Sequence, residues 1–200
     1  MSQALRIQSS APQSVRGLDA YFTPPVATWS LVRLEAAQIP GRIWEPAAGD
    51  GAMSRVLIEA GYDVVSSDIG DYGFCRSDVD YLKAPASNFA QAIVTNPPFS
   101  LAAKFAEKAI SEVDYVALLL RTNFLESVGR LPFFRRHPPT RIWLSSRRFP
   151  MMHRHGWTGK RSTSNTPHAW FIWERGAERQ AVDWFDWQEL LPRNPILNSG

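Results

Sequence analysis

Short apolar runs alternate with polar turns along most of the chain, and they predict buried strands joined by helices. The clearest run, Asp-Tyr-Val-Ala-Leu-Leu-Leu-Arg at 114–121, is apolar at consecutive positions, which is typical of a strand covered on both faces. Similar runs predict further strands near residues 43, 64, 75, 93, 142 and 171. Strands that alternate with helices indicate an α/β fold with a mostly parallel sheet.

Apolar residues at helical spacing predict helices over about residues 24–38, 52–60 and 101–110. Thr23 has the chemistry of an N-cap, and Pro24 suits the first turn of the first helix. Residues 123–130 are also predicted to be helical. Pro132 is the position at which that helix breaks or restarts.

Polar residues and glycines stand where the predicted strands end. Glu45 closes the strand near 43, the turn Ala47-Ala48-Gly49-Asp50-Gly51 follows it, and Asp68 ends the next strand 19 residues after Gly49. A strand, a glycine turn and a helix in this order bind nucleotide-like ligands, and an acid after the second strand holds a ribose diol. The turn is neither a GxGxxG nor a P-loop, so it favours an adenosine ligand without a pyrophosphate.

A further acid, Asp80, is followed by the aromatic Tyr81. A carboxylate at this position can accept a hydrogen bond from an adenine amino group, and the tyrosine ring can flank the base. Both residues are therefore candidates for recognising the adenine end of the same ligand.

The turn Asn96-Pro97-Pro98-Phe99 lies between the buried run at 92–94 and the helix expected from residue 101. Pro97 forces Asn96 into an extended conformation, and the two prolines have no backbone N–H. The turn therefore presents carbonyl oxygens, including the side-chain oxygen of Asn96, beside an aromatic ring. Such a site can accept hydrogen bonds from an amine on a flat base. An ordinary loop capped by Ser100 is the alternative.

Composition places the chain among soluble single-domain proteins. It has 200 residues, of which 44% are hydrophobic and 20% charged, enough for a sizeable core. The one cysteine, Cys75, rules out an internal disulfide and favours a reducing compartment. The sequence has no apolar run of membrane-spanning length, and residues 1–17 lack the apolar core of a signal peptide. We therefore expect a cytoplasmic protein with no membrane partner.

Positive charge is concentrated between residues 121 and 161. This segment holds ten of the 22 Lys and Arg residues and one acid, Glu126, for a net charge of +9, whereas the rest of the chain carries −6. A charge division of this kind predicts a surface that faces a polyanion; a solvated basic face without a partner is the alternative. No cluster of further ligands accompanies His153 and His155, so no metal site is expected.

The order of these motifs resembles that of class I S-adenosylmethionine-dependent methyltransferases of the adenine-N6 DNA type. Three segments carry the resemblance: Tyr21-Phe22-Thr23-Pro24, the glycine turn that begins at Glu45-Pro46, and Asn96-Pro97-Pro98-Phe99. The resemblance covers about residues 19–175 and includes the short phage and prophage enzymes, which have a late segment similar to Pro-His-Ala-Trp-Phe-Ile-Trp-Glu at 167–174.

The resemblance implies a Rossmann-like fold with a seven-stranded, mostly parallel sheet, a C-terminal antiparallel hairpin and helices on both faces. It also implies three parts of the chain. These are a flexible arm at 1–18, a methyltransferase domain at 19–175 with a basic loop at 147–167 between its last two strands, and a tail at 176–200.

The activity implied by the resemblance is direct, metal-free transfer of a methyl group from S-adenosylmethionine to the N6 amine of an adenine flipped out of DNA, leaving S-adenosylhomocysteine. The implied catalytic residues are Asn96, Pro97, Pro98 and Phe99. The implied cofactor-binding residues are Tyr21, Thr23, Pro24, Glu45, Pro46, Ala47, Gly49, Gly51, Asp68, Ile69, Asp80, Tyr81 and Asn96. The implied nucleic-acid contacts are Arg121, Asn123, Arg147, Arg148, His153, Arg154, Lys160 and Arg161.

Other substrates and one other class of function fit the same motifs. The amine-accepting turn would also serve an RNA adenine, the N4 amine of cytosine, or the side-chain amide of a protein glutamine. A catalytically silent nucleic-acid-binding module would keep the fold without the reaction. Because the chain has no large target-recognition domain, we expect recognition to come from residues 121–167 or from a second copy, or else to be weak. The chain is expected to be either a monomer or a homodimer.

Overall fold

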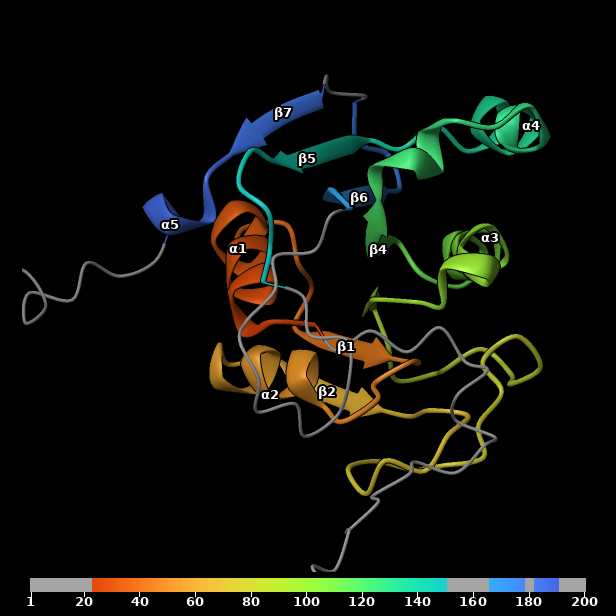
Figure 1. Cartoon of the computed structure of the whole chain (residues 1–200). Coiled ribbons are helices and arrows are strands. Elements are labelled where there is room, and N and C mark those ends of the chain that lie inside the picture. The colour runs from red at the N-terminus through yellow and green to blue at the C-terminus, as the bar shows by residue number, and fades with distance from the viewer. Residues whose placement is uncertain (1–22, 151–165, 179–181, 191–200) are drawn as a thin grey trace, which may run out of the picture.

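The computed structural model describes residues 23–150, 166–178 and 182–190 (Figure 1). Its strands form one seven-stranded sheet in the order β2-β1-β3-β4-β6-β5-β7. Strand β6 runs antiparallel to both of its neighbours, and the other adjacent pairs are parallel. The strands are β1 (Arg42–Glu45), β2 (Asp63–Ser66), β3 (Ala92–Thr95), β4 (Tyr115–Arg121), β5 (Arg141–Ser145), β6 (His168–Glu174) and β7 (Val182–Phe185). The α/β fold with an antiparallel hairpin, here β5 and β6, is confirmed.

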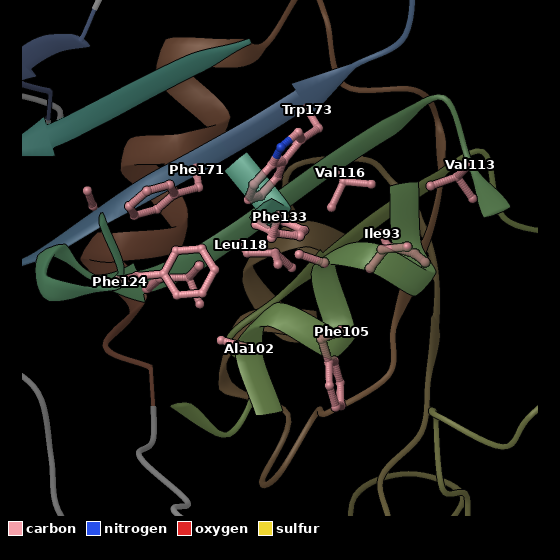
Figure 2. Packing of buried hydrophobic residues seen from close by; sticks show 14 of the residues in the cluster. Ile93, Ala102, Phe105, Val113, Val116, Leu118, Phe124, Phe133, Phe171 and Trp173 are labelled. Atoms are coloured by element: carbon pink, nitrogen blue, oxygen red, sulfur yellow. The ribbon is translucent and has the colours of Figure 1, made fainter. Parts of the chain in front are cut away.

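Helices cover both faces of this sheet, because successive strand residues point to opposite sides. One face packs against α1 (Pro25–Glu35), α2 (Ala52–Glu59) and α5 (Trp187–Leu190). The other face packs against α3 (Ala102–Glu112) and α4 (Leu131–Arg136). Figure 1 shows the two groups of helices on opposite sides of the strands, and Figure 2 shows the second core, which includes Ile93, Phe105, Leu118 and Phe171.

The strand expected near residue 75 is wrong. Between β2 and β3 the chain makes only an isolated bridge, Ser67 to Arg76. Positive backbone φ angles at Gly73 and Asp78, 71° and 60°, break the extended geometry that a strand needs. This polar, turn-rich segment therefore crosses the ends of the strands instead of extending the sheet.

The seventh strand lies where the sequence placed a C-terminal tail. Strand β7 pairs in parallel with β5. Phe185 at its end is 7% exposed and joins the core beneath α1. The strand begins with exposed residues, so only this last position carries the apolar signal of a buried strand.

The connection between β4 and α4 is less regular than the helix expected over 123–130. It consists of two 3₁₀ turns, η2 (Thr122–Leu125) and η3 (Val128–Arg130). Helix α4 then begins at Leu131 with Pro132 in its first turn, where a proline without an N–H costs no helical hydrogen bond. Pro132 therefore marks a restart.

A buried ion pair joins α1 to the far half of the sheet. Glu35, the last residue of α1, accepts hydrogen bonds from Arg141 Nε (2.9 Å) and Nη2 (2.7 Å) and from the Tyr115 hydroxyl (3.0 Å). The side chains of Glu35 and Arg141 are 1% and 7% exposed. The network fixes the position of α1, whose N-terminal end carries Thr23 and Pro24 to the site described next.

Candidate functional site

A pocket opens at the carboxyl ends of β1, β2 and β3. In a sheet of parallel strands these ends meet at one edge, where ligands bind. Glu45 ends β1, Asp68 follows β2, and Asn96 follows β3. The pocket is lined by Thr23, Glu45, Pro46, Ala47, Ala48, Gly49, Asp50, Ala52, Met53, Asp68, Ile69, Tyr72, Val79, Asp80, Tyr81, Asn96, Pro98, Leu101 and Phe105.

The turn between β1 and α2 depends on its glycines and on Asp68. Gly49 and Gly51 have φ angles of 54° and 81°, a region that glycine enters without steric cost. A Cβ atom on Gly51 would also lie 2.3 Å from the Phe74 ring. The Asp68 carboxylate accepts the N–H of Gly49 and that of Gly70, both at 2.8 Å. Asp68 therefore braces the turn, and each of its oxygens retains a lone pair for a ligand hydroxyl.

Burial shifts the pKa values of two carboxyl groups in the pocket, those of Asp68 and Glu45. Burial raises the pKa of Asp68, although its backbone hydrogen bonds oppose the shift. Burial raises the pKa of Glu45 well above its ordinary value, and the Glu45 carboxylate accepts a hydrogen bond from the Ser54 hydroxyl. An ionised carboxylate in such surroundings is stabilised by a positive charge nearby.

Asp80 and Tyr81 differ in what they offer to a ligand. A hydrogen bond from Lys83 lowers the pKa of Asp80, and the two charges lie 2.9 Å apart. Tyr81 is only 2% exposed, and its hydroxyl donates to Glu112 at 3.1 Å. Tyr81 therefore forms part of the pocket wall, whereas Ile69, which is 48% exposed, presents an accessible apolar surface.

The pocket is strongly acidic. Four of its lining residues, Glu45, Asp50, Asp68 and Asp80, have carboxyl groups. Within the described part of the chain, no Lys or Arg lines the same surface. Burial disfavours the ionised form of Glu45 and Asp68, and a positive charge nearby favours it, so this pocket suits a cationic ligand.

Asn96 is held in place by Thr23. The side-chain Nδ2 of Asn96 donates to Thr23 Oγ1 at 3.0 Å, which orients the amide and turns its oxygen away from Thr23. The expected N-cap role of Thr23 is wrong: Pro24 occupies the N-cap position of α1, which has no side-chain cap. The hydroxyl instead serves a residue 73 positions later.

Phe99 lies at the opposite side of the turn, beside the ends of β4 and β6. The guanidinium carbon of Arg121 lies 4.0 Å from the centre of the Phe99 ring, and the His168 ring centre lies 5.7 Å from it. Arg121 and His168 face each other across the β4–β6 pair. Burial, together with the charge of Arg121, lowers the pKa of His168 to about 4, so this imidazole is neutral near pH 7.

Most of the predicted cofactor-binding residues lie together. Those that line the pocket are Thr23, Glu45, Pro46, Ala47, Gly49, Asp68, Ile69, Asp80, Tyr81 and Asn96, and the predicted catalytic residue Pro98 lines it as well. Pro24, Gly51, Pro97 and Phe99 adjoin these residues in sequence without lining the pocket. Tyr21 lies outside the described residues.

Sequence reasoning missed several lining residues. Met53, Leu101 and Phe105 sit at the starts of the helices that follow the two motifs, so their spacing from the motifs carried a usable signal. Tyr72 and Val79 belong to the irregular segment between β2 and β3, where no periodic pattern identifies them.

The predicted nucleic-acid contacts are placed unevenly. Asn123 and Arg148 are exposed, whereas Arg147 binds Asp186 through hydrogen bonds of 2.7 to 3.0 Å. His153, Arg154, Lys160 and Arg161 lie outside the described residues. Within the described ranges, no three His, Cys, Asp or Glu side chains are placed to share a metal ion, and no helix there has the length and apolar character to cross a membrane.

Comparison with known proteins identifies the fold. No family model and no curated protein matches the sequence. A candidate RNA methyltransferase from Pyrococcus horikoshii has a TM-score of 0.60 at 14% identity, with 82% of this chain and 90% of that chain covered. A SAM-dependent O-methyltransferase from Thermotoga maritima has a TM-score of 0.53 at 16% identity, with 81% and 69% covered.

A third similar structure belongs to a restriction-modification system. It is a type I methyltransferase subunit from Streptococcus thermophilus, with a TM-score of 0.55 at 11% identity. The match covers 83% of this chain and 47% of that one, so the chain spans about half the length of the subunit. The fold of this chain is therefore the Rossmann-like fold of S-adenosylmethionine-dependent methyltransferases.

Proposed function

We propose that the protein is an S-adenosylmethionine-dependent methyltransferase that methylates the N6 amine of adenine in DNA. The observation that carries the proposal is an acidic pocket that ends at the Asn96 turn. S-adenosylmethionine has a cationic sulfonium, an ammonium group and a ribose diol, which are the features that such a pocket favours. The fold and the turn thus support the same chemistry.

The residues of the pocket would hold this cofactor in an extended form. Asp68 would accept hydrogen bonds from the ribose hydroxyls, and Ile69 would pack on the adenine, whose amino group would donate to Asp80. The Thr23 hydroxyl, which accepts from Asn96, still has a proton to donate to the methionine carboxylate. When bound, the cofactor supplies an activated methyl group.

The protein's part in the transfer is to orient the amine. The Asn96 side-chain oxygen and the Pro97 carbonyl would accept the two N–H groups of the target amine and direct its lone pair at the methyl carbon. These oxygens would also stabilise the positive charge that grows on the nitrogen as the N–C bond forms and the C–S bond breaks. Alignment of this kind lowers a barrier by several kcal/mol.

A nucleic-acid substrate is supported by charge and by the similar structures. The segment at 121–161 carries a net charge of +9, and phosphate contacts give sequence-independent affinity. Two of the similar structures are named for methylation of RNA and for a restriction-modification system. RNA adenine is therefore the second candidate substrate, because it would present the same amine to the same turn.

The proposal is tested by incubating the protein with methyl-labelled cofactor and, in parallel, DNA, RNA and protein. We expect label in DNA, released on hydrolysis as N6-methyladenine. Asn96→Ala should lower the rate at least about 100-fold, whereas Ser100→Ala, at an exposed neighbour, should retain it. Label in RNA or polypeptide alone would replace DNA as the substrate, and no transfer to any of the three would contradict the proposal.

A further inference from the structure

The loop at 122–131 leaves β4 beside the Asn96 turn. Strands β3 and β4 are parallel neighbours, with Thr95 opposite Leu118, so their carboxyl ends lie at the same edge of the sheet. Arg121, the last residue of β4 before the loop, has its guanidinium carbon 4.0 Å from the centre of the Phe99 ring. On its other side, the Thr122 N–H donates to the Pro167 carbonyl at 3.0 Å. The base of the loop is therefore continuous with the proposed target site.

The outer surface of the loop is apolar. Val128 is 90% exposed, and Leu125 and Leu131 are each 45% exposed. Phe124 points the other way, into the core, where the centre of its ring lies 5.5 Å from the centre of the Phe171 ring (Figure 2). Three exposed aliphatic side chains within seven residues gain little from the folding of the chain alone, and exposed apolar side chains grouped in one loop point to a binding partner.

Arg130 holds the loop rigid from within. Its Nε donates to the Phe124 carbonyl at 2.7 Å, and its Nη2 donates to the carbonyls of Asn123 and Glu126 at 2.8 and 3.0 Å. The guanidinium carbon also lies 5.1 Å from the centre of the Phe124 ring. This arginine is therefore committed to loop structure, and a surface fixed in advance loses less entropy when it binds.

The surroundings of the apolar tip favour a polyanion. Glu126 is the only acid between residues 121 and 161, and the exposed Arg135 follows on α4. An apolar tip with a basic neighbour, on a loop whose base adjoins the amine-accepting turn through Arg121 and Phe99, matches a nucleic-acid duplex that must open there. Proteins that deform duplexes insert aliphatic side chains between bases, and enzymes that modify a base must extrude it from the stack.

We propose that Leu125 and Val128 form a wedge that enters the duplex beside the target adenine and stabilises its extruded state. This inference rests on the proposed function. The wedge acts on base stacking, so it matters for a paired target and is dispensable for a target that is already unpaired. Arg130 is a positioning residue for the wedge.

The test compares two DNA duplexes of the same sequence, one fully paired and one with an abasic site opposite the target adenine. The double variant Leu125→Ser, Val128→Ser should lower methylation of the paired duplex about tenfold and leave the abasic duplex within about twofold of wild type. Ile58→Ser removes a side chain that is 52% exposed on α2 and is the matched control; it should change neither rate.

If the double variant loses methylation rate equally on both duplexes, or on neither, the wedge proposal is overturned. Fluorescence anisotropy of the two duplexes, measured without cofactor, provides a readout that does not need activity. The double variant should lower the affinity for the paired duplex more than for the abasic one, and equal changes would again overturn the inference. Failure of the wild type to methylate DNA at all would instead count against the proposed function.

Discussion

The amide of Asn96 owes its orientation to a hydroxyl that lies far away in sequence. Thr23 stands just before α1 and Asn96 just after β3, and the hydrogen bond between them is 3.0 Å long. If the Asn96 oxygen accepts the target amine, the acceptor direction is set by Thr23. Loss of this hydrogen bond would weaken the hold on the amide, and one hydrogen bond of this kind contributes about 1 kcal/mol.

Thr23→Val is therefore expected to lower kcat about fivefold to tenfold. Thr23→Ser keeps the acceptor oxygen and should restore kcat to near the wild-type value. Single-turnover rates at saturating cofactor measure the effect, and calorimetry measures cofactor affinity in parallel. A loss confined to cofactor affinity, with kcat unchanged, would show that Thr23 acts on the cofactor and not through Asn96.

His168 makes the stability of the protein depend on pH. Its pKa is lowered from 6.5 to about 4, first by burial and then by the charge of Arg121. Between these values the unfolded chain binds a proton that the folded chain does not, so stability falls as the pH drops from 6.5 towards 4. The full effect is at most about 3 kcal/mol.

Denaturant unfolding of the wild type and His168→Gln across pH 4.5 to 7.5, about the range in which histidine titrates, measures this contribution. As the pH falls, the unfolding free energy of the wild type should decrease relative to that of the variant, because only the wild type has this histidine. Parallel curves for the two proteins would contradict a lowered pKa at His168.

At the scale of the elements, the ion pair between Glu35 and Arg141 connects α1 to β5. Both side chains are buried. Removal of Glu35 leaves Arg141 with Glu174 as its remaining partner and takes the acceptor from the buried hydroxyl of Tyr115, and disruption of a buried charged network of this kind is strongly destabilising. Glu35→Ala is expected to lower the free energy of unfolding by about 3–5 kcal/mol, as measured in urea. Arg147→Ala, which breaks the exposed pair with Asp186, is the matched control.

The control should leave the unfolding midpoint close to that of the wild type, because exposed ion pairs contribute little. Similar midpoint shifts for Glu35→Ala and Arg147→Ala would contradict the assignment of Glu35 as the anchor of α1. Urea unfolding resolves the two variants without any assumption about activity.

Much of the sheet could be predicted because buried parallel strands have a strong local signal. The runs at 92–95 and 115–121 are buried almost throughout, and their apolar residues leave little choice of structure. The strand predicted near residue 75 is absent because short-range glycine and aspartate turns override the few apolar residues of that segment. Strand β7 was missed because only Phe185 is buried; its other side chains carry no apolar pattern.

The candidate site was predictable where chemistry and strand ends coincide, as at Glu45, Asp68 and Asn96. Contacts made across the fold were not. Nothing local to Thr23 indicates Asn96 as its partner, and nothing local to Arg121 indicates the ring of Phe99. Such contacts depend on the order of strands in the sheet, which sequence spacing does not specify.

For the molecule as a whole, the net charge of residues 121–161 overstates the number of basic side chains that can contact a phosphate. Arg130 binds backbone carbonyls, Arg136 pairs with Glu107, Arg141 pairs with Glu35, and Arg147 pairs with Asp186. Of the ten basic residues between 121 and 161, these four are committed within the protein. The remaining six set an upper limit on direct phosphate contacts from this segment.

The salt dependence of DNA binding should reflect this limit. A plot of the logarithm of the association constant against that of the salt concentration should have a slope no steeper than about −5. Fluorescence anisotropy at a series of salt concentrations provides the slope. A slope near −9 would contradict the structural commitment of the four arginines, and a slope near zero would contradict a polyanion surface.

The proposed function requires the acidic pocket to hold S-adenosylmethionine with its methyl group at the Asn96 turn. Isothermal titration of the cofactor into the purified protein tests it most directly, with Asp68→Ala as the variant and Asp114→Ala, an exposed acid far along the chain, as the control. We predict one binding site per chain, affinity weakened at least about tenfold by Asp68→Ala, and no effect of Asp114→Ala. Absence of binding to the wild-type protein, or equal binding by the wild type and Asp68→Ala, would contradict the assignment of this pocket to the cofactor.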